Sequence, residues 1–564
     1  MNLWTGRYKR SRRRESRRKK IYGCTAATDV IATDVGDMGK ADVDIVIVGA
    51  GILGINQLYR AQRDGYSVQL LEQGDGVGGT WYWNRYPGCR FDSESYTYGY
   101  LFSEELWHEW EWSEEFAGQP ETERYINHVV DRFDLRRLIR FGSKVDAAEW
   151  DEGSRTWTTR TADGHVVRST YLVSTTGVLS VPQYPDVPGR ATFAGEQYHT
   201  GRWPATAVDF TGKRVAVVGT GSSGVQVAPV IAEQAASLTL YQRTPTWCTP
   251  LNNHPISAEQ QAELKASFEK IRSTLAVSVA GFLHEPSGRK TFDDAKDQRW
   301  EFYERIWNSP GFAKMNSNYE DMMLDPKANK EFCDFIEEKI RGIVADQAVA
   351  DLLIPDLGYG SLRPPFVTDY YEMFNRPNVE LVSTRRHPFV RLTEAGIETA
   401  DGLREFDIIV WATGFDFATG AMLGMGIRGV DGLTLNEYWA DGPRTFLGLM
   451  CHRFPNFFFP GGPHGAAGNN PRYGGDQVDF VADLICRARE RGQDRIEVPL
   501  ETEERWAATM AKALPFSTFV EHGQYYGTNV EGKPRRFLLN PAGRPALLRV
   551  MEKTVESGYS GFLG

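Results

Sequence analysis

Two glycine-rich turns are the residues of this chain whose types and spacing most directly indicate a chemistry. Each follows a β-branched run, in VDIVIVGAGILG and RVAVVGTGSSG, and each has the pattern G-x-G-x-x-G. The six glycines are Gly49, Gly51, Gly54, Gly219, Gly221 and Gly224. In such a turn the first glycine makes the bend, the second lets backbone amides approach a pyrophosphate, and the third lets a helix pack closely. The turns predict two dinucleotide sites, with Ser222 inside the second.

The end of the following strand differs between the two units and predicts which nucleotide each one binds. VQLLEQ ends in Glu72, whose carboxylate can accept hydrogen bonds from a ribose 2′-hydroxyl. LTLYQRT places Arg243 and Thr244 at the corresponding point, where an arginine can pair with a 2′-phosphate. We therefore expect FAD in the first site and NADPH in the second. A solvated cation at a strand end is the alternative interpretation of Arg243.

Two further segments predict how these units are joined. Residues 172–189 and 408–416 each begin as a buried strand that ends in Thr-Gly, and in the second segment this pair is Thr413 and Gly414. Such a pair is expected to carry the chain out of an FAD domain and back again around an inserted NADP domain. Thr413 and Gly414 are therefore candidate cofactor-binding residues. The predicted fold class is α/β, with two Rossmann-like dinucleotide-binding domains and parallel sheets.

The helical spacing of apolar residues between about 252 and 345, as in QQAELKASFEKI, predicts a helical insertion in the NADP domain. The expected organisation is a basic, disordered leader over 1–37, the first part of the FAD domain over 38–180, the NADP domain over 181–412, and a final part over 413–564 that completes the FAD domain and contacts substrate and NADP. The leader could touch nucleic acid or an acidic membrane, but it is expected to have no structural role. No apolar segment follows it, so it is not a secretory signal.

Composition limits the partners. The 564 residues carry a net charge of −10, which argues against general nucleic-acid binding. No apolar run approaches the roughly 18 residues of a membrane span. The six cysteines are scattered, without a C-x-x-C pair or a metal-ligand cluster. These features predict a cytoplasmic enzyme without a metal or a membrane partner, as a monomer or weak homo-oligomer.

Three classes of flavoprotein use a pair of dinucleotide domains. A disulfide reductase needs two nearby cysteines, which this chain lacks. A simple oxidase or dehydrogenase needs no special linker between the domains. A monooxygenase must retain NADP after flavin reduction and exclude water, so we expect particular residues in the linker between the domains.

The linker carries such residues. FAGEQYHTGRWP has the spacing F-x-G-x-x-x-H-x-x-x-W-P at Phe193, Gly195, His199, Trp203 and Pro204. This stretch resembles the fingerprint of the type I Baeyer–Villiger monooxygenases, which are class B flavoproteins. Related linkers in other flavin monooxygenases usually lack the Trp-Pro ending. By itself, His199 would more often be a structural histidine.

A second segment carries the same resemblance. GGTWYWNRYPGCRFD, over 78–92, is similar to the family pattern G-G-x-W-x4-[FY]-P-G-x3-D. It nominates Gly79, Thr80, Trp81 and Asp92 as cofactor-binding residues. The resemblance covers the chain from about residue 43 to its end, except for the helical insertion.

The resemblance implies an NADPH- and O2-dependent conversion of a ketone to an ester or lactone through a flavin C4a-peroxide. SLRPPFVTDYYEMF matches the family segment that holds the catalytic arginine, which nominates Arg363. A fixed cation would keep the peroxide deprotonated, and Asp92 matches the acid that pairs with this arginine. In the family, the linker His and Trp affect domain movement, which is the role expected of His199 and Trp203. Arg363 could instead be a surface cation before Pro-Pro, and Asp92 a turn former.

Two other functions stay open. The same flavin chemistry could oxygenate sulfur or nitrogen, and a non-catalytic NADPH sensor could share the fold.

The chain also departs from the family pattern, because Leu362 replaces a common Lys, Gln524 replaces a Trp that contacts NADP, and Ala205 replaces Thr, Ser or Asp. Phosphate recognition is then expected to depend more on Arg243 and Thr244. The glycine-rich loop 457–477 suggests a roomy pocket for a bulky or cyclic ketone.

Overall fold

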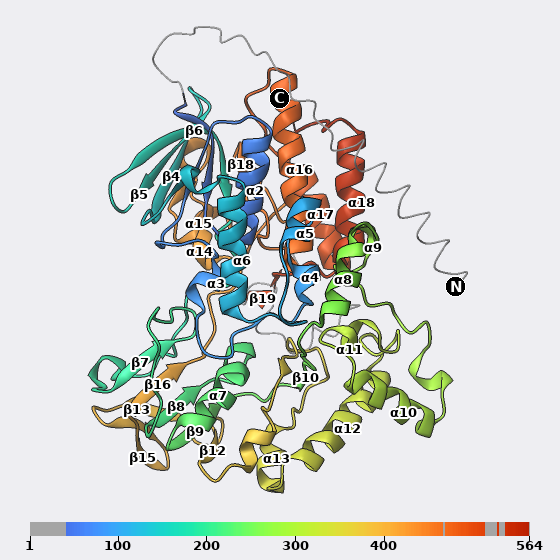
Figure 1. Cartoon of the computed structure of the whole chain (residues 1–564). Coiled ribbons are helices and arrows are strands. Elements are labelled where there is room, and N and C mark those ends of the chain that lie inside the picture. The colour runs from blue at the N-terminus through green and yellow to red at the C-terminus, as the bar shows by residue number, and fades with distance from the viewer. Residues whose placement is uncertain (1–40, 466–467, 514–526, 529–535, 563–564) are drawn as a thin grey trace.

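The computed structural model describes residues 41–465, 468–513, 527–528 and 536–562. Two separate sheets organise this part of the chain, and Figure 1 shows them as an upper and a lower unit, with a group of helices beside the lower one. The expected leader over 1–37 and Gln524 lie outside the described residues.

The first sheet surrounds the first glycine turn. Its strand order is β17 (Ile427–Arg428), β4 (Val145–Asp151), β5 (Thr156–Thr161), β6 (Val166–Ser174), β1 (Val43–Val48), β2 (Val68–Leu71) and β3 (Ile139–Arg140), and β18 (Phe457–Phe458) also pairs with β6. Strand β1 is parallel to both β2 and β6, and its last four residues are buried, as expected of a β-branched central strand. Strands β17 and β18 show that the chain returns to this sheet after leaving it.

The second sheet is entirely parallel. Its strand order is β12 (Val379–Ser383), β9 (Ser237–Gln242), β8 (Arg214–Val218), β16 (Ile408–Trp411) and β7 (Glu196–His199). Helix α7 (Ser222–Gln234) follows β8 and precedes β9, so the second glycine turn lies at the carboxyl end of β8. A small antiparallel sheet separates β12 from β16 and consists of β13 (Phe389–Leu392), β14 (Gly396–Thr399) and β15 (Gly402–Glu405).

The two crossover segments lie side by side. Strand β6 leaves the first sheet beside β1, and β16 leaves the second sheet beside β8. After these strands, the Thr413 hydroxyl donates to the carbonyl of Gln183 at 2.5 Å, and the Gln183 amide donates to the carbonyl of Gly414 at 2.9 Å. The outgoing and returning chains therefore form one double connection between the sheets.

Ten α-helices of the described residues lie outside the unit of the second sheet and the insertion. They are α2 (Ile52–Arg63), α3 (Thr80–Trp83), α4 (Ser95–Tyr98), α5 (Glu104–Glu109), α6 (Gln119–Arg132), α14 (Gly420–Leu423), α15 (Leu435–Tyr438), α16 (Asn470–Glu490), α17 (Leu500–Ala513) and α18 (Gly543–Glu556). Helix α16 packs along α2 and also contacts α18, so the C-terminal helices enclose the side of the first nucleotide unit (Figure 1).

The helical insertion lies between two short paired strands, β10 (Thr249–Pro250) and β11 (Phe366–Val367). Its helices are α8 (Ala258–Ala266), α9 (Phe268–Val277), α10 (Lys296–Trp307), α11 (Ala313–Asn316), α12 (Pro326–Ile343) and α13 (Gln347–Leu353). The Asp325 side chain caps α12 and Pro326 occupies its first turn, which are favoured residues at these positions. One face of α12 buries Phe332, Phe335 and Ile336.

The fold class expected from the sequence is confirmed: two Rossmann-like units and a helical insertion. The strands next to both glycine turns are parallel, and β4, β5 and β6 add antiparallel pairs to the first sheet. A further short pair, β19 (Gly527–Thr528) and β20 (Arg536–Phe537), lies near the C-terminus. Within the described residues, none of the helices is long and apolar enough to cross a membrane. The same residues contain no cluster of three or more His, Cys, Asp or Glu side chains suited to a metal ion.

Candidate active site

A cavity of about 430 Å³ lies at the first glycine turn. The sequence-nominated residues that line it are Gly49, Gly51, Glu72, Gly79, Thr80 and Trp81. The segment 175–181 that follows β6 adds a second wall, and residues 420–425 near α14 contribute a third. Two residues of the glycine-rich stretch 457–477 also line this space, Gly461 and Gly474, but the expected loop is helical from residue 470, so Gly474 lies in the first turns of α16.

The N-terminus of α2 fits the pyrophosphate of a dinucleotide. Gly51 occupies the N-cap of α2, and no side chain of the described residues caps this helix end. The first backbone amides of a helix lack partners within the helix and favour a bound anion. A Cβ at Gly54 would lie 1.9 Å from the carbonyl oxygen of Gly49, which explains the third glycine of the turn. These residues fit FAD as the group that the cavity would hold.

Glu72 lies buried at the end of β2 and holds the glycine turn in place. Its carboxylate accepts hydrogen bonds from the amides of Ala50 at 2.7 Å and Gly74 at 2.8 Å. Burial raises the pKa of Glu72, and these amide hydrogen bonds act in the opposite direction. The acid that was expected to meet a ribose therefore also organises the backbone around the cavity.

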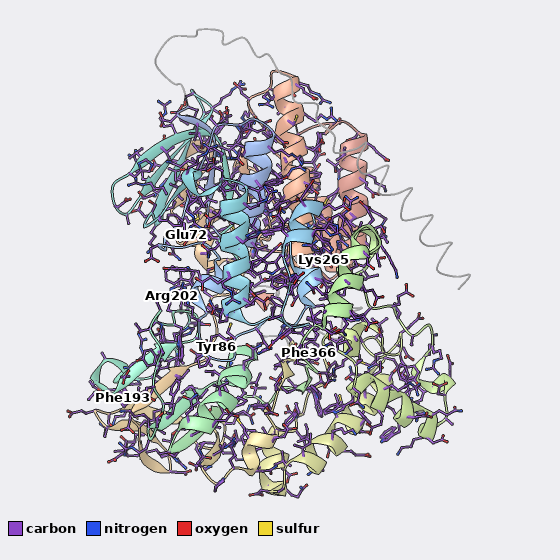
Figure 2. The ribbon with its side chains drawn as sticks, in the orientation of Figure 1. Glu72, Tyr86, Phe193, Arg202, Lys265 and Phe366 are labelled. Atoms are coloured by element: carbon purple, nitrogen blue, oxygen red, sulfur yellow. The ribbon has the colours of Figure 1, made fainter. Side chains whose placement is uncertain are left out.

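Arg202 lines the same cavity, although sequence reasoning did not nominate it. Its guanidinium lies 4.4 Å from the ring centre of Trp83 and donates to the carbonyl of Ser180 at 2.8 Å. Figure 2 shows Arg202 between Glu72 of the first unit and Phe193 of the second. Arg202 lies between His199 and Trp203 of the fingerprint, which could have nominated it. The sequence does not distinguish a cavity residue at that position from a surface residue.

The second glycine turn forms a similar but more open site. Gly221 is the N-cap of α7, again without a capping side chain from the described residues, and a Cβ added there would have no described atom within 4 Å. Arg243 lies exposed just after β9. The Thr220 hydroxyl donates to the carbonyl of Thr244 at 3.3 Å, which connects the turn to the end of β9. A free helix N-terminus next to an arginine fits NADP.

Arg363 connects the two units. One of its nitrogens, Nη2, donates to Oδ2 of Asp92 at 2.5 Å, and the other, Nη1, donates to the Ser222 hydroxyl at 2.8 Å. The Asp92 side chain is 4% exposed and that of Arg363 is 36% exposed. Burial raises the pKa of Asp92, whereas the positive charge of Arg363 lowers it. The arginine is thus held by an acid of the first unit and by the glycine turn of the second.

An aromatic cluster from the helical insertion and β11 lies on one side of this arginine. The guanidinium carbon of Arg363 lies 5.7 Å from the ring centre of Phe312. Phe312 stacks on Phe282 with ring centres 4.5 Å apart and meets Phe366, labelled in Figure 2, edge-on at 4.8 Å. A Cβ at Gly311 would lie 2.9 Å from the Asp92 carbonyl oxygen, so the insertion packs directly on the acid. Sequence reasoning drew no site residue from this insertion.

The linker fingerprint ties the second sheet to the first unit. Phe193 is buried in the core of the second sheet, and a Cβ at Gly195 would lie 2.5 Å from its ring. The backbone amide of Trp203 donates to the carbonyl of Trp83 in α3 at 3.1 Å, and its indole ring is buried. Pro204, which is partly exposed, follows this contact.

His199 ends β7 and is buried between the crossover segments. Its Nδ1 accepts a hydrogen bond from the Gly201 amide at 2.9 Å, and its ring packs against Tyr184 and Phe415. Burial lowers the pKa of His199 to about 4, so the side chain is neutral at pH 7. A neutral, packed histidine serves the linker geometry and carries no charge toward a substrate.

Thr413 and Gly414 do not lie among the residues that line the first cavity. They form the hydrogen bonds of the double connection between the sheets, directly after the Ala412 carbonyl that approaches Gly219. Leu362 precedes Arg363 and brings no charge to the second site.

Comparisons with known proteins agree with this arrangement. The model of the pyridine nucleotide-disulphide oxidoreductase family matches residues 46–329. A 2-oxo-Δ3-4,5,5-trimethylcyclopentenylacetyl-CoA monooxygenase of Pseudomonas putida is 40% identical and aligns over 92% of this chain and 98% of its own length. A Baeyer–Villiger monooxygenase of Pseudooceanicola batsensis is 36% identical, over 93% of this chain and 96% of its own. The chain belongs to the Baeyer–Villiger monooxygenases.

The likeness extends to solved structures and to one relative with a different printed activity. A crystal structure of OTEMO in complex with FAD and NADP superposes with a TM-score of 0.90 at 40% identity and covers 93% of this chain and 100% of that one. A phenazine N-monooxygenase of Lysobacter antibioticus is 36% identical, over 93% of this chain and 98% of its own. As a Baeyer–Villiger monooxygenase, this protein uses FAD and NADPH, in agreement with the two sites described above.

Proposed function

We propose that this protein catalyses the NADPH- and O2-dependent oxidation of a ketone to an ester or lactone. The observation that carries the proposal is the position of Arg363, which a buried acid holds between the two nucleotide sites. FAD, when bound and reduced by NADPH, supplies the activation of oxygen. The residues of the chain bind, orient and shield the reactants around it.

Arg363 would provide a fixed positive charge where negative charge develops on the reacting oxygens. A guanidinium stays protonated at all physiological pH values, and its charge acts strongly where water is excluded. Asp92 is a positioning residue, because its buried carboxylate fixes one edge of the guanidinium. Phe312, whose ring centre lies 5.7 Å from the guanidinium carbon, would help its aromatic neighbours to exclude water from this arginine.

The substrate class is proposed to be bulky or cyclic ketones. The relative from Pseudomonas putida is named for a substituted cyclopentenyl substrate, and Gly461 and Gly474 of this chain line the first cavity. Glycines at these positions leave room for a large substrate next to the flavin site.

Oxygenation of a nitrogen or sulfur atom is the second candidate, and the likeness to a phenazine N-monooxygenase supports it. The ketone reaction is favoured because it needs a cation beside the attacking anionic oxygen, which Arg363 supplies. We also propose that the enzyme acts in the cytoplasm, where NADPH is supplied, as a monomer or weak homo-oligomer.

Product analysis tests the function. The purified flavoprotein, NADPH and oxygen would be incubated with phenylacetone, cyclohexanone, cyclododecanone, a steroid ketone and a thioether. Mass spectrometry should find an ester or lactone with one added oxygen. Sulfoxide as the sole product would favour the heteroatom reaction, and products from the larger ketones only would support the proposed substrate class.

A further inference from the structure

A second arginine lies next to the residues expected to bind the 2′-phosphate of NADPH. Nη2 of Arg385 donates a hydrogen bond to the Thr244 hydroxyl at 3.2 Å. Arg385 and Thr244 are 141 residues apart in the chain, so sequence spacing does not relate them. The contact brings a new cation to the site at the end of β9.

The sheet explains why these residues meet. Strands β9 and β12 are parallel neighbours, and Gln242 is in register with Ser383 at their carboxyl ends. The Thr384 amide extends this pairing by donating to the Gln242 carbonyl at 2.7 Å. The next residues of the two strands, Arg243 with Thr244 and Arg385, therefore emerge at the same edge of the sheet. Ligands of open α/β sheets bind at this carboxyl edge.

The contact with Thr244 also links Arg385 to the glycine turn. The Thr244 carbonyl accepts a hydrogen bond from Thr220, the residue between Gly219 and Gly221. A nucleotide whose pyrophosphate lies at the N-terminus of α7 would extend its ribose toward the end of β9, as in other Rossmann units. Arg385 is therefore placed at the ribose end of the site.

The charges around Arg385 suit a phosphate. The Arg385 side chain is 52% exposed, and its Nη1 lies 3.8 Å from Oδ2 of Asp356, which is 70% exposed. Such a long, solvated ion pair contributes little, so the guanidinium is available to a stronger anion. Arginines recognise phosphate oxygens through charge-assisted hydrogen bonds.

We propose that Arg385 is a further specificity-determining residue, which adds a second cation to the 2′-phosphate subsite expected at Arg243 and Thr244 and strengthens the preference for NADPH over NADH. This inference rests on the proposed function only in taking NADPH as the reductant. Arg385 supplies a second cation at a site where Leu362 brings none, and Asp356 competes with the phosphate for its guanidinium.

Binding measurements on the oxidised, FAD-loaded protein test this subsite without turnover. Isothermal titration calorimetry would give the Kd of NADP+ and of NAD+ for the wild type, Arg385→Gln and Arg386→Gln. Arg386 is the matched control, because it is the adjacent exposed arginine and its replacement removes the same charge. We expect Arg385→Gln to weaken NADP+ binding about tenfold or more and to change NAD+ binding less than twofold. Arg386→Gln should change NADP+ binding less than threefold.

A second variant provides an independent test with the opposite sign. Asp356→Asn removes the competing carboxylate and should tighten NADP+ binding about two- to fivefold while leaving NAD+ unchanged. The role of Arg385 would be overturned if Asp356→Asn did not tighten NADP+ binding, or if Arg385→Gln weakened the binding of NADP+ and NAD+ equally. It would also be overturned if Arg386→Gln weakened NADP+ binding as much as Arg385→Gln does. If the wild type itself binds NADP+ no tighter than NAD+, the proposed reductant fails as well, so the two failures are distinguishable.

Discussion

Arg363 donates a hydrogen bond from Nη1 to the hydroxyl of Ser222 at 2.8 Å. Ser222 is the first residue of α7 and lies within the second glycine turn, directly after Gly221, so the cation proposed for catalysis is in contact with the NADP site. Nη2 of the same guanidinium contacts Asp92 of the first unit. A nucleotide that moves the glycine turn would therefore also move one edge of Arg363.

Replacement of Arg363 should abolish the ketone reaction while leaving flavin reduction largely intact. Removing one preorganised charge-stabilising group typically costs a factor of about 10² to 10³ in kcat. We expect this loss of ester formation in Arg363→Ala, with reduction of the bound flavin by NADPH, followed at 450 nm under anaerobic conditions, changed less than about tenfold. Arg363→Lys should recover only part of the activity, because it cannot contact Asp92 and Ser222 together. Full oxygenation by Arg363→Ala would contradict the mechanism.

Replacement of Asp92 should disturb the position of Arg363 and not its charge. In Asp92→Ala the guanidinium loses the acid that holds it, and we expect kcat for ester formation to fall about 10- to 100-fold with a smaller change in KM for the ketone. Unfolding by urea should show a loss of about 1–3 kcal/mol in stability, typical of a removed hydrogen bond to a buried charged group. Asp92→Glu is the matched variant. Its carboxylate is restored at a different distance from Arg363, so we expect it to recover more of the free energy of unfolding than of kcat.

Stability should decrease in acid because of His199. Burial lowers its pKa to about 4 from an ordinary value of 6.5, so between these values the unfolded chain binds a proton that the folded chain does not. The contribution of His199 to the free energy of unfolding is therefore fully present above about pH 6.5. It is lost as the pH falls toward 4, and the loss is at most about 3 kcal/mol. Denaturant titrations of the wild type and His199→Gln at pH 7.5 and 5.0 measure the difference. An equal pH response of the two proteins would exclude this role of His199.

Two glycine-to-alanine changes should have opposite effects on stability. In Gly195→Ala the new Cβ would lie 2.5 Å from the Asp407 carbonyl oxygen and from the Phe193 ring, and we expect a loss of about 1–3 kcal/mol. Gly342 lies exposed near the end of α12, and a Cβ there has no described atom within 4 Å. Gly342→Ala should therefore leave stability unchanged or raise it by up to about 1 kcal/mol. Urea unfolding followed by circular dichroism gives both values.

Arg202 should contribute to retention of FAD. Its side chain lines the first cavity and donates to the Ser180 carbonyl, whereas Arg190, which lies just before the linker, is placed over the Tyr184 ring and does not line that cavity. We expect Arg202→Gln to weaken FAD binding by about tenfold, the effect of one lost charge-assisted contact, and Arg190→Gln to leave it unchanged. Reconstitution of flavin-free protein, followed by quenching of FAD fluorescence, measures both. Equal FAD affinity in the two variants would show that Arg202 does not contribute to FAD binding.

The sequence was sufficient wherever the chemistry depends on neighbouring residues. The two glycine turns, Glu72 and Arg243 follow from the local pattern of strand, turn and helix, because a tight turn before a helix N-terminus needs particular residues at fixed spacing. The helical character of the insertion also follows from local periodicity. Its contribution to the site does not, since nothing in the spacing of Gly311 and Phe312 shows that they pack beside Asp92 and Arg363.

By itself, the sequence therefore determined the fold class and the two nucleotides, and through its resemblance to a family it nominated Asp92 and Arg363 as site residues. The tertiary structure alone decided which residues meet: Arg363 reaches Asp92 across 271 positions and Ser222 across 141, and Arg385 reaches Thr244 across 141. The physical reason is that local periodicity reports how a residue contacts its own helix or strand. Contacts between distant segments depend on the order of strands in the sheets and on how the insertion packs, which no short pattern encodes.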